Sequence, residues 1–247
     1  MAREKLSRII PRLDARATTA FSLVVLAGLA FAWRDRNLMN PDGVSYLDLA
    51  DSWRRGDVAG GINAFWSPMY PMLLGGVFAL LRPAPEWLFP CVHLVNFGIF
   101  VLALMAFGFF LREAFDLGRK GDEGLPWPWI VFGAGTFVVA ALDQIGIWNV
   151  SPDLLVAAFL FASAGLSLRV LRGSASRRLL LVTGTVLGGG YVAKAVLLPI
   201  GFLLVVFLLM RLWKHVPGSR AAKFAALLLP YTLCVAPLAI ALSIREG

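Results

Sequence analysis

The sequence predicts an all-α, polytopic transmembrane helix bundle of about seven spans, forming a single membrane domain over residues 1–247. Hydrophobic residues make up 59% of the chain and charged residues only 15%, whereas soluble domains are about half apolar and a quarter charged. Uncharged runs recur at roughly the 20-residue length that a bilayer core requires. The basic residues fall in clusters between these runs, as in cytoplasmic loops, and not in the single patch expected for nucleic-acid binding.

The first expected span, 17–33, follows a basic N-terminus. Ala30-Phe31-Ala32 resembles a signal-peptidase site, so a cleaved signal peptide is the alternative, but the further apolar runs favour an uncleaved anchor. The fifth and sixth of the later spans are short and meet at Lys194–Pro199, which predicts tilted or broken helices. The later spans are expected at 88–111, 128–143, 153–171, 179–194, 198–213 and 222–243.

The apolar segment Pro71–Leu81 decides the predicted topology. It is too short to cross a bilayer, so we expect it to be interfacial or re-entrant. With this segment outside, four basic clusters holding 16 of the 23 lysines and arginines fall on one side, which the positive-inside rule makes cytoplasmic. We therefore expect a multi-pass protein of the cell (inner) membrane with a cytoplasmic N-terminus. If the segment spanned, every later cluster would change sides.

Two outer loops result from this topology. The first, from Arg34 to about Trp87, is long and rich in aromatic residues, so we expect order and function there. Its turn at 40–42 leads into a helix ending near Gly56, with Val44, Leu47, Ala50 and Arg54 on one face, as in a helix lying on the membrane surface. The second outer loop, 143–152, is short and is flanked by acids.

Three ionisable residues are candidates for chemistry. Asp42 is either a functional carboxylate or the N-cap of the first-loop helix. Asp153 follows Ser151 and Pro152, so it is either a second carboxylate at the mouth of the bundle or part of an ordinary helix start. Lys194 interrupts a long apolar stretch, where a charge usually faces a partner or a wet cavity; the alternative is a lysine snorkelling to the interface.

Aromatic residues of the first loop are candidates for substrate binding. The segment 65–71 contains Trp66 and Tyr70 and is suited to form a wall for a sugar or lipid, and Tyr46 of the first-loop helix joins this set. Interfacial anchoring is the alternative for such rings. No metal site is predicted, because His93 is isolated and the two cysteines show no ligand spacing.

Four segments together resemble the GT-C superfamily of membrane glycosyltransferases, which includes protein O-mannosyltransferases and the aminoarabinose transferases that modify lipid A. The resemblance covers nearly the whole chain and rests on the order of short motifs relative to the spans. They are PDGVSYLDLA in the first loop, FWSPMYPMLLGG downstream, SPDLLVAAFL opening the fourth span, and GGGYVAKAVLLPI.

The resemblance implies transfer of a sugar from a polyprenyl-phosphate donor, with inversion, to a glycan, lipid or protein acceptor on the non-cytoplasmic face. Asp42 would be the general base, Asp153 would orient the acceptor or a metal, and Lys194 would stabilise the lipid phosphate. The resemblance assigns no cofactor with certainty. Gly43 stands where many members carry a second acid, so a divalent metal is an option only. The chain lacks a Gly-rich nucleotide-binding motif, which suits a lipid donor.

Relatives of this kind usually continue with more spans and often a soluble domain. We therefore expect the chain to be an N-terminal module of a longer glycosyltransferase, and its activity in isolation is left open. Two other functions compete with this interpretation. A transporter or flippase-like subunit for lipid-linked sugars would use the same cavity but tolerate Asp42→Asn. In a membrane scaffold, the three ionisable residues would be purely structural.

Overall fold

The structure, a computed structural model, describes residues 15–116, 126–215 and 219–246, and this part of the chain consists of helices and connecting loops, without strands. Five of its helices are long and apolar enough to cross a membrane. Their apolar segments are Ala17–Arg34, Pro85–Phe115, Asp153–Leu171, Leu197–Lys214 and Arg220–Arg245. The all-α membrane architecture expected from the sequence is thus confirmed, and the other two expected spans fall on shorter helices.

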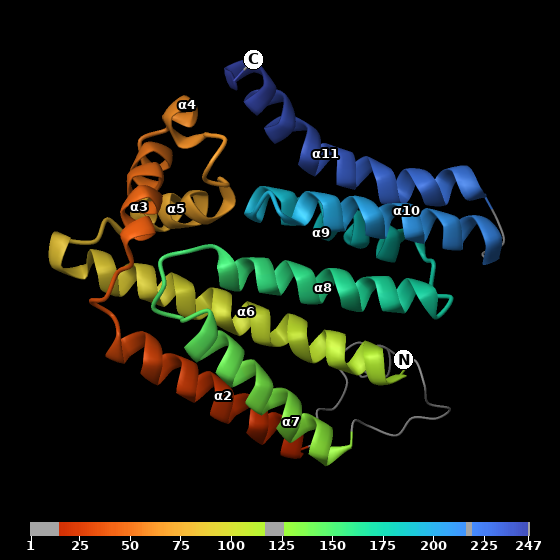
Figure 1. The fold of residues 1–247 in the computed structure, drawn as a ribbon, viewed down its shortest axis with the longest axis horizontal. Helices are drawn as coiled ribbons and strands as arrows, with labels where there is room; N and C mark the ends of the chain where they lie inside the picture. Colours follow the sequence, from red (N-terminus) through yellow and green to blue (C-terminus); the bar gives the residue numbers. More distant parts are fainter. Residues whose placement is uncertain (1–14, 117–125, 216–218, 247) are drawn as a thin grey trace, which may run out of the picture.

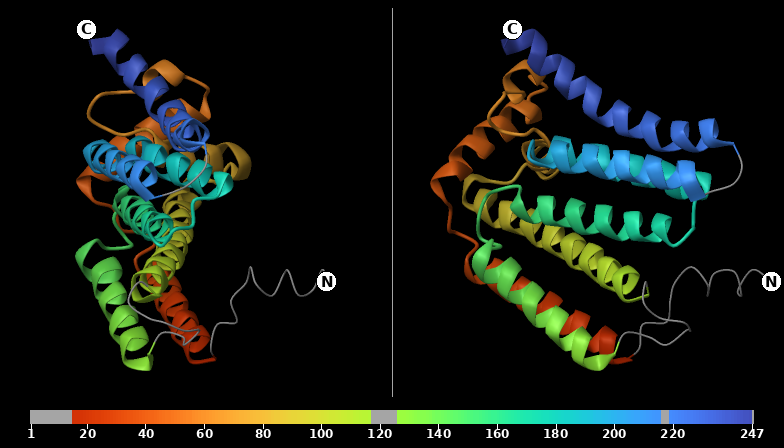
Figure 2. Two further views of the ribbon diagram at one scale, coloured as in Figure 1. Left: turned by 90° about the vertical axis from the view of Figure 1, so that its right-hand side faces the viewer. Right: turned by 45° about the vertical axis from the view of Figure 1, so that its right-hand side comes forward.

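Within the described residues, seven helices lie side by side and three short ones gather at one end of them (Figures 1 and 2). The short helices are α3 (Pro41–Arg54), α4 (Val58–Gly61) and α5 (Met69–Leu81). The seven are α2 (Ala15–Arg34), α6 (Leu88–Asp116), α7 (Trp127–Val138), α8 (Asp153–Leu171), α9 (Arg177–Ala193), α10 (Leu197–His215) and α11 (Arg220–Glu246). A 3-10 turn, η1 (Pro85–Trp87), precedes α6, and a π-helical turn, η2 (Val139–Gln144), continues α7.

The expected helices correspond to observed ones with ends shifted by a few residues. The break expected between the fifth and sixth spans is also present, because α9 ends at Ala193 and α10 begins at Leu197. The basic residues before Ala15, and Arg119 and Lys120 of the second basic cluster, lie outside the described residues.

The first-loop helices pack tightly on each other. A Cβ atom on Gly75 of α5 would lie 2.6 Å from the backbone oxygen of Ala50 in α3, so the two helices touch at the backbone. Ala50 is fully buried, while Val44 is 50% exposed. Of the face expected to lie on the membrane surface, Val44 thus stays outside the protein interior, whereas Ala50 packs against α5. The buried face of α3 is formed by Gly43, Tyr46, Leu49 and Ala50.

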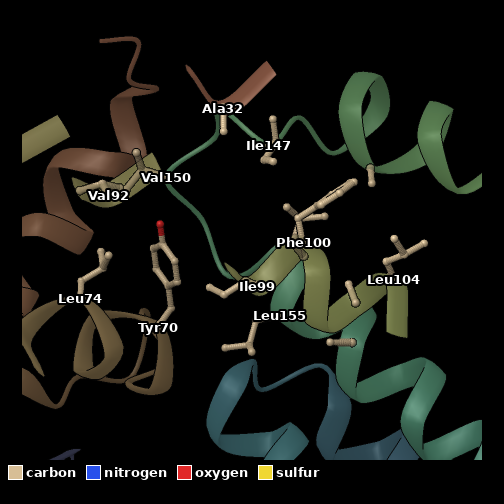
Figure 3. Packing of buried hydrophobic residues seen from close by; sticks show 14 of the residues in the cluster. Ala32, Tyr70, Leu74, Val92, Ile99, Phe100, Leu104, Ile147, Val150 and Leu155 are labelled. Carbon is tan, nitrogen blue, oxygen red and sulfur yellow. The ribbon is translucent and has the colours of Figure 1, made fainter. Parts of the chain in front are cut away.

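Two clusters of buried side chains hold the bundle together. The first joins α2, α3, α5, α6, α7 and α8 through residues such as Phe100, Tyr70 and Leu74, and it includes Ile147 and Val150 of the second loop (Figure 3). The second cluster joins the four helices α8, α9, α10 and α11 through a separate set of buried side chains that includes Leu180, Leu208 and Leu227. Because the first cluster includes both loops, its packing fixes their relative positions.

Small residues allow α9 to approach α11 closely, as the Gly184–Gly188 spacing predicts. A Cβ atom on Gly184 would lie 2.2 Å from the Leu227 backbone oxygen, and one on Gly188 would lie 2.6 Å from that of Tyr231. The predicted close packing is confirmed. It leaves no room for a larger side chain at either position.

Arginine side chains join helices at the two ends of the bundle. At the end away from α3–α5, the buried carboxylate of Glu113 in α6 accepts hydrogen bonds from Arg169 (Nε to Oε1, 2.9 Å) and from Arg172, both near the end of α8. At the opposite end, Arg245 of α11 donates to the backbone oxygen of Ala59 at 2.6 Å and to that of Ile62. The last helix is thus fastened to the first loop.

Candidate functional site

The second loop is fastened to the bundle by one buried amide. Asn96 of α6 is 2% exposed, and its Nδ2 donates to the backbone oxygens of Ile147 (3.1 Å) and Asn149 (2.9 Å). Its Oδ1 accepts a 2.7 Å hydrogen bond from the Tyr70 hydroxyl. Because all three partners are satisfied by one side chain, Asn96 sets the position of the second loop relative to α5.

The start of α3 is held against this same loop. Asn40, the N-cap residue, turns its Oδ1 away from the helix and accepts a 2.8 Å hydrogen bond from the Val150 amide. Gly43 packs so closely that a Cβ atom there would lie 2.9 Å from Cβ of Val150 and 2.8 Å from Cγ of Met39. The two loops that carry Asp42 and Asp153 therefore meet directly.

Asp42 lies in the first turn of α3, with Asn40 as the N-cap residue. The N-cap alternative for Asp42 is therefore not what the structure shows. Asp42 is exposed. Within the described part of the chain, its carboxylate has no hydrogen-bond or ion-pair partner. A carboxylate of this kind remains available to accept a proton.

Asp153 and Lys194 form an ion pair, with Nζ 2.6 Å from Oδ1 and each side chain 43% exposed. The other carboxylate oxygen, Oδ2, accepts a 3.1 Å hydrogen bond from the Ser151 hydroxyl. Lys194 reaches this position because the chain is extended at the C-cap of α9. The Ser67 hydroxyl stabilises the break between α9 and α10 by accepting a 3.1 Å hydrogen bond from the Ala195 amide.

The rings of Trp66 and Tyr70, two of the three predicted aromatic residues, each pack edge-to-face against the third, Tyr46. The ring centroid of Tyr46 lies 4.8 Å from that of Trp66 and 5.3 Å from that of Tyr70. Tyr70 is fully buried and Tyr46 is 4% exposed, whereas Trp66 is partly exposed. Trp66 is therefore the ring that faces outward, and Tyr70 supports Tyr46 from behind.

Tyr46 links the two carboxylates electrostatically. Burial raises the pKa of its hydroxyl, and the negative charges of Asp153 and Asp42 raise it further. Both carboxylates thus lie close enough to Tyr46 for their charges to act on it. The structure brings together Asp42, Tyr46, Trp66, Asp153 and Lys194, which we call the carboxylate site.

The sequence reasoning missed two residues that build this site, Asn96 and Ser67. Asn96 carried a usable signal, because an amide in an apolar span needs a buried partner. Ser67 carried no signal of its own, since its partner amide is that of Ala195, 128 residues along the chain. Only the folded chain relates the two.

Two further features bear on what the carboxylate site can bind. Among the described residues, no group of three or more His, Cys, Asp or Glu side chains is arranged to hold a metal ion. A groove of about 750 Å³ lies on a different face of α3, lined by residues that include Asp48 and Phe78, and it contains no member of the carboxylate site. The ionisable groups of the carboxylate site are thus accessible, since Asp42 is exposed and the side chains of Asp153 and Lys194 are each 43% exposed.

Comparison of the chain with protein-family models, curated proteins and solved structures found no match in any of the three.

Proposed function

We propose that the chain is a membrane glycosyltransferase module that transfers a sugar from a polyprenyl-phosphate donor to an acceptor at the carboxylate site. The observation that carries the proposal is the contact between the loop that bears Asp42, an unpaired carboxylate, and the loop that leads to the Asp153–Lys194 ion pair. Both carboxylates also act electrostatically on the buried Tyr46. These are the residues that the resemblance to GT-C enzymes selects for chemistry. They come from separate segments of the chain, which favours a common role.

The proposal includes a topology of seven spans with the N-terminus cytoplasmic, in the cell (inner) membrane. Beyond the five long helices, α9 has 17 residues, or about 25 Å of helix, which lies at the lower limit for a span. α7 continues without interruption through η2, and together they cover 127–144. Seven crossings place the first loop, the second loop, Lys194 and Arg245 on one side. The contact of Arg245 with Ala59 is consistent with this arrangement.

In the proposed reaction, a carboxylate oxygen of Asp42 accepts the proton of the acceptor hydroxyl. The hydroxyl oxygen then forms a bond to the anomeric carbon from the side opposite the phosphate. The bond between that carbon and the phosphate oxygen breaks, and its electron pair leaves with the polyprenyl phosphate. No general acid is needed, because a phosphate is already a good leaving group.

Lys194 stabilises the charge that develops on the departing phosphate. In the absence of donor its ammonium group is held by Asp153, and the half-exposure of both side chains leaves that group reachable. Asp153 thus keeps Lys194 in place and offers a second carboxylate to orient the acceptor. Trp66 provides an apolar ring face against which a sugar can stack.

The test uses the full chain reconstituted in liposomes with polyprenyl-phosphate mannose or polyprenyl-phosphate aminoarabinose, and it measures release of polyprenyl phosphate. Asp42→Asn is expected to lower turnover by about 100-fold or more, the range of a lost general base, while donor binding is retained. Asp143→Asn is the matched control, because Asp143 is an exposed acid of the second loop. Unchanged turnover in Asp42→Asn would overturn the assignment.

The same preparation separates the competing functions. A transporter or flippase-like subunit would move the labelled donor across the bilayer equally well with Asp42→Asn. A scaffold would bind no donor, so Lys194→Gln would change only thermal stability. Divalent-metal dependence is tested by adding a chelator to the wild-type assay.

A further inference from the structure

The groove beside α3 is a second, separate place for a ligand. Its volume of about 750 Å³ is within the range of pockets that hold small molecules. It lies between α3, the end of α5 and the start of α6. Its apolar lining includes Phe78, Leu88 and Phe89, and its charged lining consists of Asp48, Asp51, Arg54 and Arg82. The four formal charges cancel, so the groove is polar without being anionic or cationic.

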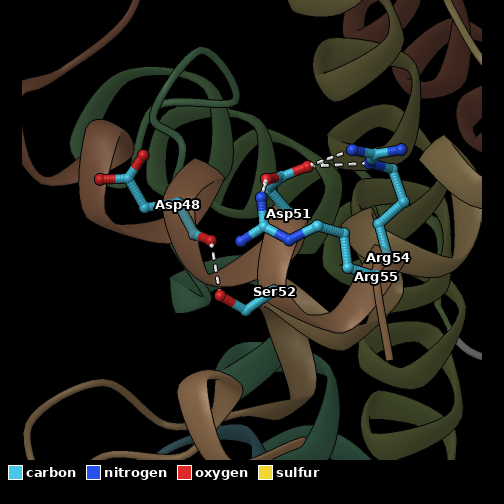
Figure 4. A network of polar contacts seen from close by, with 5 residues as sticks. All are labelled: Asp48, Asp51, Ser52, Arg54 and Arg55. Atoms are coloured by element: carbon cyan, nitrogen blue, oxygen red, sulfur yellow. Dashed lines mark hydrogen bonds and ion pairs between the residues drawn. The ribbon is translucent and has the colours of Figure 1, made fainter. Parts of the chain in front are cut away.

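Two of these four charges are already paired within α3. Asp51 Oδ1 accepts hydrogen bonds from Arg54 Nε at 2.8 Å and Nη2 at 2.6 Å, and Oδ2 accepts one from Arg55 (Figure 4). The hydrogen bonds from Arg54 are the largest cause that holds the pKa of Asp51 below its ordinary value. Asp51 and Arg54 are thus satisfied without a ligand.

The other two charges are not paired. Within the described residues, neither the Asp48 carboxylate nor the Arg82 guanidinium has a hydrogen-bond or ion-pair partner, and Figure 4 shows Asp48 directed away from both arginines. Arg82 is also the single described non-glycine residue with a positive φ, 47°, at the C-cap of α5. This conformation costs about 1–2 kcal/mol for an L-residue. The groove therefore offers one unpaired anion and one unpaired cation.

The residues around the groove place it at a membrane surface. Leu80 is 80% exposed and Trp87 is 56% exposed, immediately before the long apolar helix α6. Exposed tryptophans at the ends of such helices lie at the level of the lipid headgroups. A ligand in the groove would therefore have its polar part in the headgroup region and its apolar part in contact with the bilayer.

We propose that this groove binds the zwitterionic headgroup of phosphatidylethanolamine, with the phosphate at Arg82 and the ammonium group at Asp48. An anionic lipid would pair with Arg82 but leave Asp48 facing its negative charge. A choline headgroup has no N–H to donate to a carboxylate and is bound best by aromatic cages. A primary ammonium group satisfies Asp48 with a charge-assisted hydrogen bond, and the acyl chains lie against Leu88 and Phe89.

This inference does not depend on the glycosyltransferase proposal, because no residue of the groove belongs to the carboxylate site. The two can therefore fail separately. Lipid retention tests the groove, and turnover of a sugar donor tests the carboxylate site.

The experiment measures which lipids the full chain retains, by native mass spectrometry in detergent. The protein is delipidated and offered equal amounts of phosphatidylethanolamine, phosphatidylcholine and phosphatidylglycerol with identical acyl chains. The wild-type chain is expected to retain at least about five times as much phosphatidylethanolamine as phosphatidylcholine. This ratio corresponds to the free energy of a weak charge-assisted hydrogen bond. Asp48→Asn is expected to abolish this preference, and Arg82→Gln to lower retention of all three lipids.

Glu86→Gln is the matched control, since Glu86 is an exposed acid just before α6 that does not line the groove. Asp48 and Arg82 are exposed and unpaired, so their substitution leaves no buried group without a partner, and equal thermal unfolding will confirm folding. Equal retention of the three lipids by wild type, or an unchanged preference in Asp48→Asn, overturns the proposal. So does preferential retention of phosphatidylglycerol. Free phosphoethanolamine that displaces the lipid at equal concentration would show a soluble ligand instead of a lipid.

Discussion

At the scale of single residues, the carboxylate site depends on one buried hydrogen-bonding side chain and on one glycine at a close contact. Asn96 satisfies three polar groups from two loops, and Gly43 allows α3 to reach Val150. Neither residue would take part in the proposed chemistry. Both hold the first and second loops together, and the proposed function requires that contact.

Gly43→Ala is expected to destabilise the chain by about 1–3 kcal/mol, the usual cost of overpacking, because its Cβ would clash with Val150 and Met39. Thermal unfolding in detergent measures the effect. The matched control is Gly76→Ala in α5, where a Cβ atom would meet nothing within 4 Å. There alanine is expected to be neutral or stabilising, since it favours helix more than glycine does. Equal unfolding temperatures for the two variants would contradict this account of Gly43.

Residue identity alone predicted much of the carboxylate site. Asp42, Asp153 and Lys194 stood out because ionisable groups are rare in so apolar a chain, and the structure brings Asp153 and Lys194 into contact. The roles of the aromatic residues could not be predicted, since burial separates Tyr70 from Trp66 and depends on packing between α3 and α5. The sequence likewise gave no reason to expect Asp48 and Arg82 in one groove.

At the scale of helices, apolar runs and glycine spacing were informative because each depends on local sequence. The 3.6-residue repeat of α3, in contrast, did not identify the face that packs against the rest of the protein. Val44 and Leu47 line the groove, and the buried face is instead formed by Gly43, Tyr46, Leu49 and Ala50. An apolar side chain beside a membrane does not have to face the protein interior, so hydrophobicity could not identify the packed face.

The contact between α9 and α11 gives a prediction at this scale. Gly188→Leu is expected to separate the two helices and to lower thermal stability by several degrees, because a Cβ atom there already lies 2.6 Å from the Tyr231 backbone oxygen. Gly98→Leu in α6 is the control, since a Cβ atom at Gly98 meets nothing within 4 Å. The account of this interface fails if Gly188→Leu unfolds at the same temperature as Gly98→Leu.

At the scale of the whole molecule, the number of crossings decides whether the two loops share a compartment. The proposed seven spans depend on α7 with η2 and on α9, the two shorter units. Single cysteines at Ala64, Asp143 and Ala195, in a chain lacking Cys91 and Cys234, are expected to react with a membrane-impermeant thiol reagent added to intact cells. All three positions are exposed in the structure.

A cysteine at Ser174, also exposed, serves as the cytoplasmic control and is expected to react only after the cells are opened. If α7 does not cross the membrane, Asp143→Cys and Ala64→Cys will label from opposite sides. Asp42 and Asp153 would then lie on opposite sides of the membrane and could not act on one substrate. If α9 does not cross, Ala195→Cys will behave like Ser174→Cys. Each shorter helix is thus tested by its own position.

The contact between Arg245 and the oxygens of Ala59 and Ile62 joins positions 186 and 183 residues apart. During synthesis the first loop leaves the ribosome long before α11, since chains emerge from the N-terminus at about 5–20 residues per second. For that interval the carbonyls of Ala59 and Ile62 must be satisfied by water or by another protein. These contacts of the first loop therefore form only after the last helix has been synthesised.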